Sequence, residues 1–284
     1  MYIQVKNLSY TYNKDLPNEG KALDDVSFNV EKNSVLGVIG HTGSGKSTLL
    51  QMLNGLIQPD EGDVIIGEDR ITEEKFPLVK IRRKVGLVFQ YPEYQLFEET
   101  VKKDVMFGPS NLGVEDPDEL ELIARDAIEK VGLNYDAIAE NSPFELSGGQ
   151  KRRVAIAGVI AMKPEVLILD EPTAGLDPES RAELIRLIKD LQKKEDMVLI
   201  FVSHNMNDIA TLADKIIVLD KGKIVMEGSP EEIFSMEDEL NEIGLGLPNV
   251  TRIMHRIGDE IPDLDKDIFT TAEASKELSR VIYD

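Results

Sequence analysis

The sequence predicts an α/β protein whose core is a mainly parallel sheet flanked by helices. Continuous apolar runs recur along the chain, and helical patterns separate them, as is typical of doubly wound sheets. One run leads directly into the glycine-rich residues 40–47 and then into a helical pattern. The stretch from 90 to 163 has no strand pattern and is expected to be mainly helical.

The chain begins with two segments of alternating polarity, 3–8 and 26–30, which flank a loop rich in Asn, Asp, Pro and Gly. Alternation with a period of two predicts half-buried antiparallel strands. We therefore expect an antiparallel β subdomain beside the parallel sheet.

The strands of the parallel sheet are expected where the apolar runs are nearly uninterrupted, because such strands are buried on both faces. These runs are 35–39, 85–89, 166–169, 198–202 and 216–219. A helix should follow the first run, over residues 47–53.

The character of the sequence changes after Gly228. Ser229, Pro230 and Glu232 match a capping box with proline at the first helical position, so a short helix should begin there. Two apolar stripes at helical spacing follow, at 250–257 and 274–282. The expected organisation is one domain over 1–229, with a helical subdomain at about 91–163, and a small helical appendage over 230–284.

Bulk composition excludes several classes of function. The 284 residues carry a formal net charge of −21, which opposes binding to the phosphate backbone of nucleic acids. The chain has no cysteine and thus no disulfide, which fits the cytosol. The start has no signal-peptide pattern, and the longest apolar stretch, 154–162, is about half the length of a membrane-spanning helix.

Residues 40–47 (Gly-His-Thr-Gly-Ser-Gly-Lys-Ser) match the P-loop pattern GxxxxGK[ST], which is expected by accident in roughly one chain in a hundred of this length. In such a loop, backbone amides form a nest for phosphate oxygens, Lys46 reaches the β- and γ-phosphates, and the Ser47 hydroxyl is a ligand of Mg²⁺. The preceding strand argues against an ordinary glycine-rich turn. The residues expected to bind ATP here are Gly40, His41, Thr42, Gly43, Ser44, Gly45, Lys46, Ser47 and Thr48.

A second apolar run ends in two carboxylates, Asp170 and Glu171. In a parallel sheet this position lies at the carboxyl edge, beside the P-loop. Asp170 is expected to hold Mg²⁺, and Glu171 to orient or deprotonate the attacking water. The alternative is a strand that ends in a solvated acidic turn.

A third motif, residues 146–150 (Leu-Ser-Gly-Gly-Gln), is absent from P-loop proteins in general. The three motifs in this order resemble the ATP-binding subunits of ABC transporters, over residues 1 to about 230. The resemblance implies that Ser147, Gly148, Gly149 and Gln150 contact ATP held by a different subunit, so that one chain alone should be a poor ATPase.

The same resemblance implies further roles by matching position. Gln90 is similar to the glutamine that senses Mg²⁺ and the transmembrane partner, and residues 174–177 resemble the D-loop. His204 is similar to the switch histidine that contacts the γ-phosphate and organises the catalytic glutamate. Tyr12 resembles the aromatic residue that stacks on adenine, although Tyr10 remains an alternative.

Within that family, residues 89–108 and 243–248 resemble the CbiO/EcfA-type ATPases of energy-coupling factor (ECF) transporters, in particular the second of two paralogues. The resemblance implies a heterodimer with a paralogue at the cytoplasmic face of the cell membrane. A transmembrane T component would dock near Gln90 to Asp104, and a substrate-binding S component for a vitamin or a metal ion would be served indirectly. The implied appendage helps to hold the ATPase dimer together.

The docking segment combines aromatic side chains with negative charge. Tyr91, Tyr94 and Phe97 supply apolar contact, and Glu93, Glu98, Glu99 and Asp104 supply carboxylates that could receive an arginine of the T component. The alternative is a solvated acidic helix.

Three other functions stay open at this point. The chain could be the ATPase of an importer with a conventional substrate-binding protein, a soluble ABC ATPase of DNA repair or translation, or a nucleotide-binding regulator without turnover. The 90–146 interval is too short for the coiled coil of the repair type, and one P-loop is too few for the tandem translation type.

Overall fold

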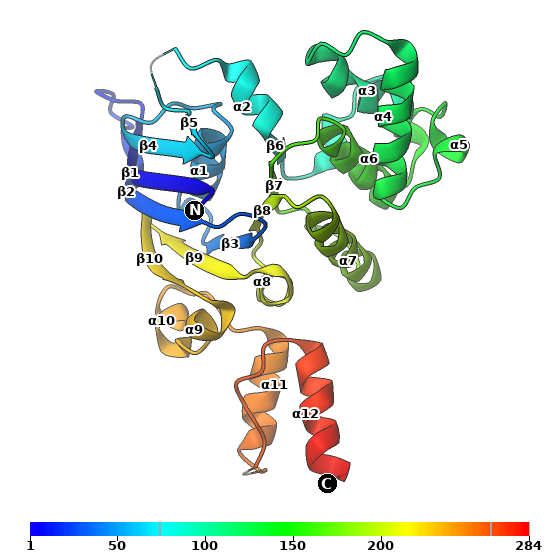
Figure 1. Ribbon diagram of the computed structural model, residues 1–284. Helices are drawn as coiled ribbons and strands as arrows, with labels where there is room; N and C mark the ends of the chain where they lie inside the picture. Colours follow the sequence, from blue (N-terminus) through cyan, green and yellow to red (C-terminus); the bar gives the residue numbers. More distant parts are fainter. Residues whose placement is uncertain (74, 262, 284) are drawn as a thin grey trace.

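The computed structural model describes residues 1–73, 75–261 and 263–283, and its main feature is a six-stranded sheet in the order β10-β9-β3-β8-β7-β6 (Figure 1). The strands are β3 (Val35–Gly40), β6 (Val85–Val88), β7 (Val166–Asp170), β8 (Val198–Val202), β9 (Lys215–Asp220) and β10 (Lys223–Gly228). All but β10 run parallel. Every residue of β3, β6 and β8 is buried, which confirms the prediction from the apolar runs.

A four-stranded antiparallel sheet in the order β2-β1-β4-β5 lies beside it. It consists of β1 (Ile3–Tyr12), β2 (Gly20–Val30), β4 (Glu61–Ile66) and β5 (Asp69–Arg70). The pairing of β1 with β2 confirms the expected antiparallel subdomain. Strands β4, β5 and β10 were not predicted, and the predicted strand at 85–89 was one residue too long, since Phe89 lies outside β6 and is exposed.

Between Gln90 and Pro164, where the structure describes every residue, the chain is helical and contains no strand, as the sequence predicts. Its elements are η1 (Pro92–Gln95), α3 (Val101–Asn111), α4 (Pro117–Lys130), α5 (Tyr135–Ile138), η2 (Pro143–Glu145) and α6 (Gly148–Ile160). Figure 1 shows these helices grouped on one side of the sheets. The core helices of the rest of the α/β part are α1 (Lys46–Leu53), α2 (Leu78–Lys84), α7 (Pro178–Lys194) and α8 (Met206–Leu212).

Four helices end the chain: α9 (Pro230–Phe234), α10 (Glu237–Glu242), α11 (Asn249–Gly258) and α12 (Thr271–Tyr283). The predicted capping box forms, with reciprocal hydrogen bonds between Ser229 and Glu232. Helices α11 and α12 extend away from the sheets as a hairpin (Figure 1) with a small core of its own around Met254. Ile253 and Ile282, which the sequence assigns to apolar stripes, are 54% and 68% exposed.

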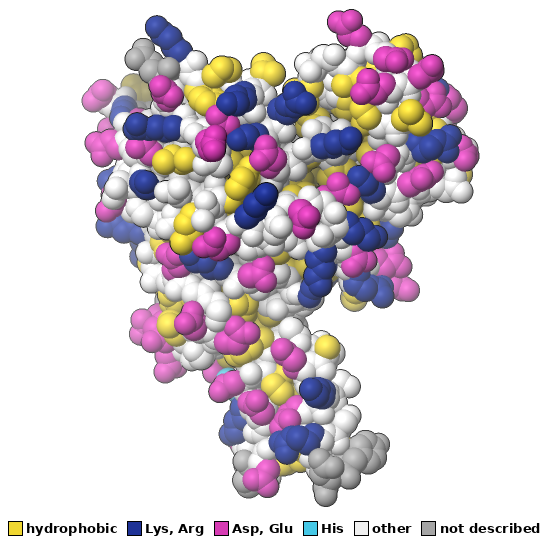
Figure 2. Space-filling model, in the orientation of Figure 1, with side chains coloured by type: hydrophobic (Ala, Val, Ile, Leu, Met, Phe, Trp, Pro, Cys, Tyr) yellow, Lys and Arg dark blue, Asp and Glu magenta, His cyan; other side chains and the backbone are white. Residues whose placement is uncertain are grey.

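Acidic side chains gather over α9 and α10 in Figure 2, in keeping with the net negative charge. In the described part of the chain, no helix is long and apolar enough to cross a membrane.

Candidate nucleotide site

The parallel strands bring most of the P-loop together with Gln90, Asp170, Glu171 and His204 at one edge of the sheet. Because β3, β6, β7 and β8 run in the same direction, their carboxyl ends meet at one edge. A pocket of about 480 Å³ lies there. Its lining consists of Tyr12, Ala22, Thr42, Gly43, Gly45, Lys46, Ser47, Thr48, Gln90, Asp170, Glu171 and His204.

The P-loop closes tightly on the start of α1. Gly45 caps this helix with φ of 107°, and a Cβ atom there would lie 2.5 Å from the Ala22 carbonyl oxygen. Only glycine fits such a position without strain. The Lys46 ammonium donates hydrogen bonds to the carbonyls of Gly40 and His41, both at 2.7 Å, and burial lowers the pKa of Lys46. The loop thus holds a buried positive charge at the floor of the pocket.

The residues predicted to bind Mg²⁺ all line this pocket. The Ser47 hydroxyl donates to Asp170 Oδ2 at 3.4 Å, and Gln90 lines the same space. Among the described residues there is no cluster of three or more His, Asp or Glu side chains that could hold a metal ion. A hydroxyl and one carboxylate fit Mg²⁺, which binds through few protein ligands together with substrate phosphates and water.

Glu171 combines an unusual backbone with an unusual environment. Its φ of 50° lies in the left-handed region, and its side chain is only 11% exposed. Burial, with a smaller effect from the nearby Asp170 charge, raises the pKa of Glu171 to about 7. Its Oε1 has no hydrogen-bond partner among the described residues, although His204 Nε2 lies 3.3 Å away, within ion-pair range.

His204 follows β8 and is half exposed beside Glu171. Burial, together with the positive charge of Lys46, lowers the pKa of His204. The imidazole is therefore neutral near pH 7 and, depending on its tautomer, offers a donor or an acceptor toward the pocket.

Of the two tyrosines considered for adenine stacking, Tyr12 lines the pocket and Tyr10 does not. The Tyr12 hydroxyl lies 3.2 Å from Thr48 Oγ1. Tyr10 packs edge-on against the Tyr12 ring with centroids 4.8 Å apart. This arrangement favours Tyr12 as the stacking residue and Tyr10 as its support.

Three P-loop residues of the predicted set lie elsewhere. Gly40 and Ser44 lie outside the pocket lining, and Ser44 is buried. The His41 side chain turns toward the appendage, where its Nε2 contacts the Ile243 carbonyl oxygen. His41 and His204 line a second, neighbouring pocket of about 320 Å³ together with residues 244–247.

The 146–150 motif lies outside this pocket altogether. Ser147 caps α6 in a capping box with Gln150, which explains a serine followed three residues later by glutamine. Ser147 and Gly148 are exposed, and Ser147, Gly149 and Gln150 line a separate pocket of about 260 Å³. Within one chain, the motif therefore adds nothing to the P-loop pocket.

Two polar contacts next to the site were not predicted. Thr173 donates to the buried Asp208 at 2.8 Å, and the buried Arg152 donates to backbone oxygens just after Glu171. No local signal marks Arg152, because it stands between two other basic residues, Lys151 and Arg153.

Known proteins resemble this chain over most of its length. The family model described as "ABC transporter" matches residues 23–174. The "Energy-coupling factor transporter ATP-binding protein EcfA2" of Clostridioides difficile is 52% identical over 99% of this chain and 98% of its own length. The EcfA2 protein of Clostridium tetani is 50% identical over 99% of this chain and 97% of its own length.

Solved structures agree with the sequence relatives. CbiO1 from Clostridium perfringens, described as part of the ABC transporter complex CbiONQ, gives a TM-score of 0.76 at 33% identity, over 90% of this chain and 98% of that chain. The ATP-binding cassette MJ0796, solved as a dimer bound to ADP and Pi, gives 0.72 at 30% identity, over 80% and 98%.

The fold and the site define a P-loop ATPase of the ATP-binding cassette type. The chain belongs to the ABC transporter family, and its two clostridial relatives bear the name of ATP-binding proteins of energy-coupling factor transporters.

Proposed function

We propose that this chain is one of two ATPase subunits of an ECF-type importer, and that ATP hydrolysis at its pocket drives uptake of a micronutrient such as a vitamin or a metal ion. The observation that carries the proposal is the convergence of Lys46, Glu171 and His204 on one pocket in a chain of the ABC transporter family. Names of the relatives favour the ECF type over a conventional importer or a soluble ABC ATPase.

Each pocket residue has a role that follows from its chemistry. Tyr12 stacks on adenine, and the P-loop amides with Lys46 bind the phosphates. Mg²⁺, when bound, neutralises phosphate charge, and Ser47, Gln90 and Asp170 are the residues that would hold it. Glu171 orients the attacking water and accepts its proton, which a carboxylate with a pKa near 7 does well. His204 fixes the Glu171 side chain.

A second chain completes each site in this proposal. The motif residues Ser147, Gly148, Gly149 and Gln150 are exposed or partly exposed and none of them lines the P-loop pocket. Their partner in the proposal is the ATP bound by the other subunit. The proposed second chain is a paralogue. In this proposal the appendage hairpin contacts that chain through apolar side chains such as the exposed Ile253 and Ile282.

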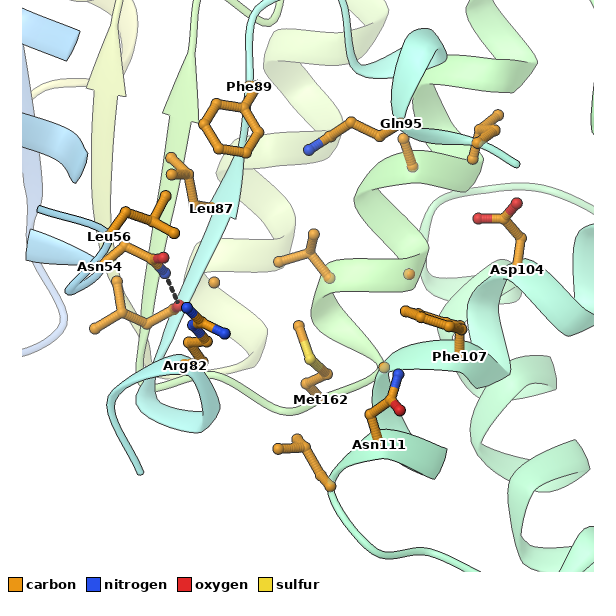
Figure 3. A pocket seen from close by; sticks show the side chains of 18 of the residues that line it. Asn54, Leu56, Arg82, Leu87, Phe89, Gln95, Asp104, Phe107, Asn111 and Met162 are labelled. Atoms are coloured by element: carbon orange, nitrogen blue, oxygen red, sulfur yellow. Dashed lines mark hydrogen bonds between the residues drawn. The ribbon is translucent and has the colours of Figure 1, made fainter. Parts of the chain in front are cut away.

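The docking region for the T component is an apolar groove beside η1. A pocket of about 560 Å³ opens there, lined by Phe89, Phe97, Phe107 and Asp104 among others. Figure 3 shows Leu56, Leu87 and Phe89 on one wall, Asp104 and Phe107 on the other, and Met162 between them. Such a groove suits one amphipathic helix. Docking there would hold this chain at the cytoplasmic face of the membrane.

Existing contacts narrow the set of carboxylates that could receive a basic residue of that helix. Glu93 is bonded to Arg152, and Glu99 pairs with Lys103 at 2.7 Å. Asp104 accepts hydrogen bonds from the amides of Phe97 and Glu98, both at 2.9 Å, yet its side chain still borders the groove. Asp104 and Glu98 remain the strongest candidates for this contact.

Affinity purification of the tagged chain from mild detergent tests the proposal. We expect a second ATPase subunit and an integral membrane protein to co-purify, and the complex to hydrolyse ATP. In Glu171→Gln, hydrolysis should fall by ~10²–10⁴ while ATP still binds, whereas the exposed control Glu119→Gln should match the unaltered complex. Near-normal turnover in Glu171→Gln would remove this residue from its role, and the absence of membrane proteins would contradict the ECF assignment.

A further inference from the structure

Arg152 is a buried arginine whose guanidinium group joins three segments of the chain. It lies in α6, two residues after the last residue of the 146–150 motif, and its side chain is 5% exposed. One nitrogen, Nη1, donates to the carbonyl oxygens of Pro172 at 2.8 Å and Ala174 at 3.0 Å. A buried guanidinium needs partners for all its donors, and these two carbonyls satisfy one side of it.

The other side of the guanidinium binds the docking segment. Arg152 Nε and Nη2 donate to both carboxylate oxygens of Glu93 at 3.2–3.3 Å. Glu93 belongs to η1 (Pro92–Gln95), which begins two residues after Gln90. The pair has the forked geometry in which arginine binds carboxylate most specifically.

The turn that accepts hydrogen bonds from Arg152 also sets the position of the Glu171 side chain. A non-glycine residue in the left-handed region is strained and persists only where its surroundings fix it. The Glu171 amide bonds to the Val202 carbonyl at 3.0 Å, and Thr173 bonds to Asp208. Arg152 adds two hydrogen bonds to the same turn, through the carbonyl oxygens of residues 172 and 174.

We propose that Arg152 is a positioning residue that links the docking segment to Glu171. When the membrane partner shifts η1, Glu93 carries the shift to the guanidinium, and the guanidinium moves the 172–174 turn and with it the Glu171 carboxylate. Hydrogen-bonded networks of this kind can couple distant sites when they have more than one arrangement. This inference rests on the proposed function, because it needs a partner at the groove.

Conservative variants test the link with little risk to the fold. Arg152→Lys keeps the charge but has no fork, so it cannot hold Glu93 and both carbonyls together. Glu93→Gln keeps the shape and the turn contacts but removes the ion pair and leaves only one oxygen to accept from Arg152. Asp136→Asn is the matched control, since it breaks an arginine–carboxylate pair at 2.8 Å elsewhere in the helical subdomain, with Arg125.

The measurement compares kcat and KM for ATP in the complete detergent-purified complex and in the ATPase pair without its membrane subunits. We expect Arg152→Lys to lower kcat about ten-fold in both, with KM within two-fold. In Glu93→Gln, the ratio of kcat in the complex to kcat in the pair should change at least three-fold. The change should bring that ratio closer to one. The double variant should have the kcat of Arg152→Lys, because the two residues act in series.

The outcomes separate the inference from the proposed function. If the unaltered complex hydrolyses ATP normally but Glu93→Gln keeps the ratio of the unaltered protein, or Arg152→Lys keeps its kcat, the link is overturned and the proposed function stands. If Asp136→Asn changes the ratio as much as Glu93→Gln does, the effect is general to the subdomain and the link is also overturned. Absence of hydrolysis in the unaltered complex overturns the proposed function and the inference together.

Discussion

At the scale of single residues, Glu171 shows most clearly how the proposed function conflicts with stability. Its backbone is left-handed and its carboxylate is buried without a hydrogen-bond partner for Oε1 among the described residues. Both features cost free energy, and neither is needed to end a strand. A water-activating base gains from both, because burial raises its proton affinity and the turn aims it into the pocket.

The raised pKa of Glu171 predicts the pH dependence of hydrolysis. In the proposed role the ionised carboxylate is the active form. The kcat of the assembled complex should therefore fall as the pH drops through about 7, approaching ten-fold per pH unit well below that value. His204 has a pKa lowered by burial, so it is neutral around pH 7, where the fall in kcat begins. Rates measured from about pH 5.5 to 8.5 check this, and a flat kcat across that range would contradict it.

The same shift predicts how Glu171 affects folding. Because the pKa of Glu171 is about 7 when folded and near 4.5 otherwise, ionising it destabilises the fold as the pH rises from about 4.5 to 7. Glu171→Gln removes this loss of stability. Relative to the unaltered protein, the free energy of unfolding of the variant should be higher by near zero at pH 4.5 and by at most about 3 kcal/mol at pH 8. Urea unfolding at both pH values measures the gain, and Glu119→Gln should show none.

At the scale of elements, uninterrupted apolar runs were enough to predict β3 and β6 to β9, because these strands are buried on both faces. Strand β10 was missed since its burial alternates between exposed and intermediate. The two-residue β5 and the charged helix α2 carry too little periodicity to be recognised. The pocket residues followed from motifs, whereas Arg152 and Asp208 act through tertiary contacts that no local pattern encodes.

Helix α9 offers a direct test of the capping box that the sequence predicts at its start. The hydroxyl of Ser229 accepts from the Glu232 amide, and the Glu232 carboxylate accepts from the Ser229 amide. The helix carries the fully buried Ile233 and Phe234, so its loss would disturb the core. Ser229→Ala should lower the unfolding free energy by about 0.5–2 kcal/mol without changing ATP affinity. Ser229→Thr should restore most of it, and equal stability of the Ala and Thr variants would refute the capping role.

At the scale of the whole molecule, the P-loop and the 146–150 motif line two different pockets. Lys46 lies in the P-loop pocket, and Ser147 lies at the start of α6 in another. If two chains complete each other's sites, a change at Lys46 and a change at Ser147 damage different ATP sites of the dimer. If both residues served one site, the second change would add nothing to the first.

The number of nucleotides trapped per dimer distinguishes these two arrangements in the assembled complex. Lys46→Ala removes the buried ammonium of the P-loop, and Ser147→Arg places a bulky charge at the exposed cap of α6. We expect each change alone to leave one of two nucleotides trapped per dimer and the double variant to leave none, because the lost contacts belong to separate sites. Rapid gel filtration with labelled ATP counts them. A double variant that traps as much as Lys46→Ala alone would show that both residues act on one site, and the paired arrangement would then be wrong.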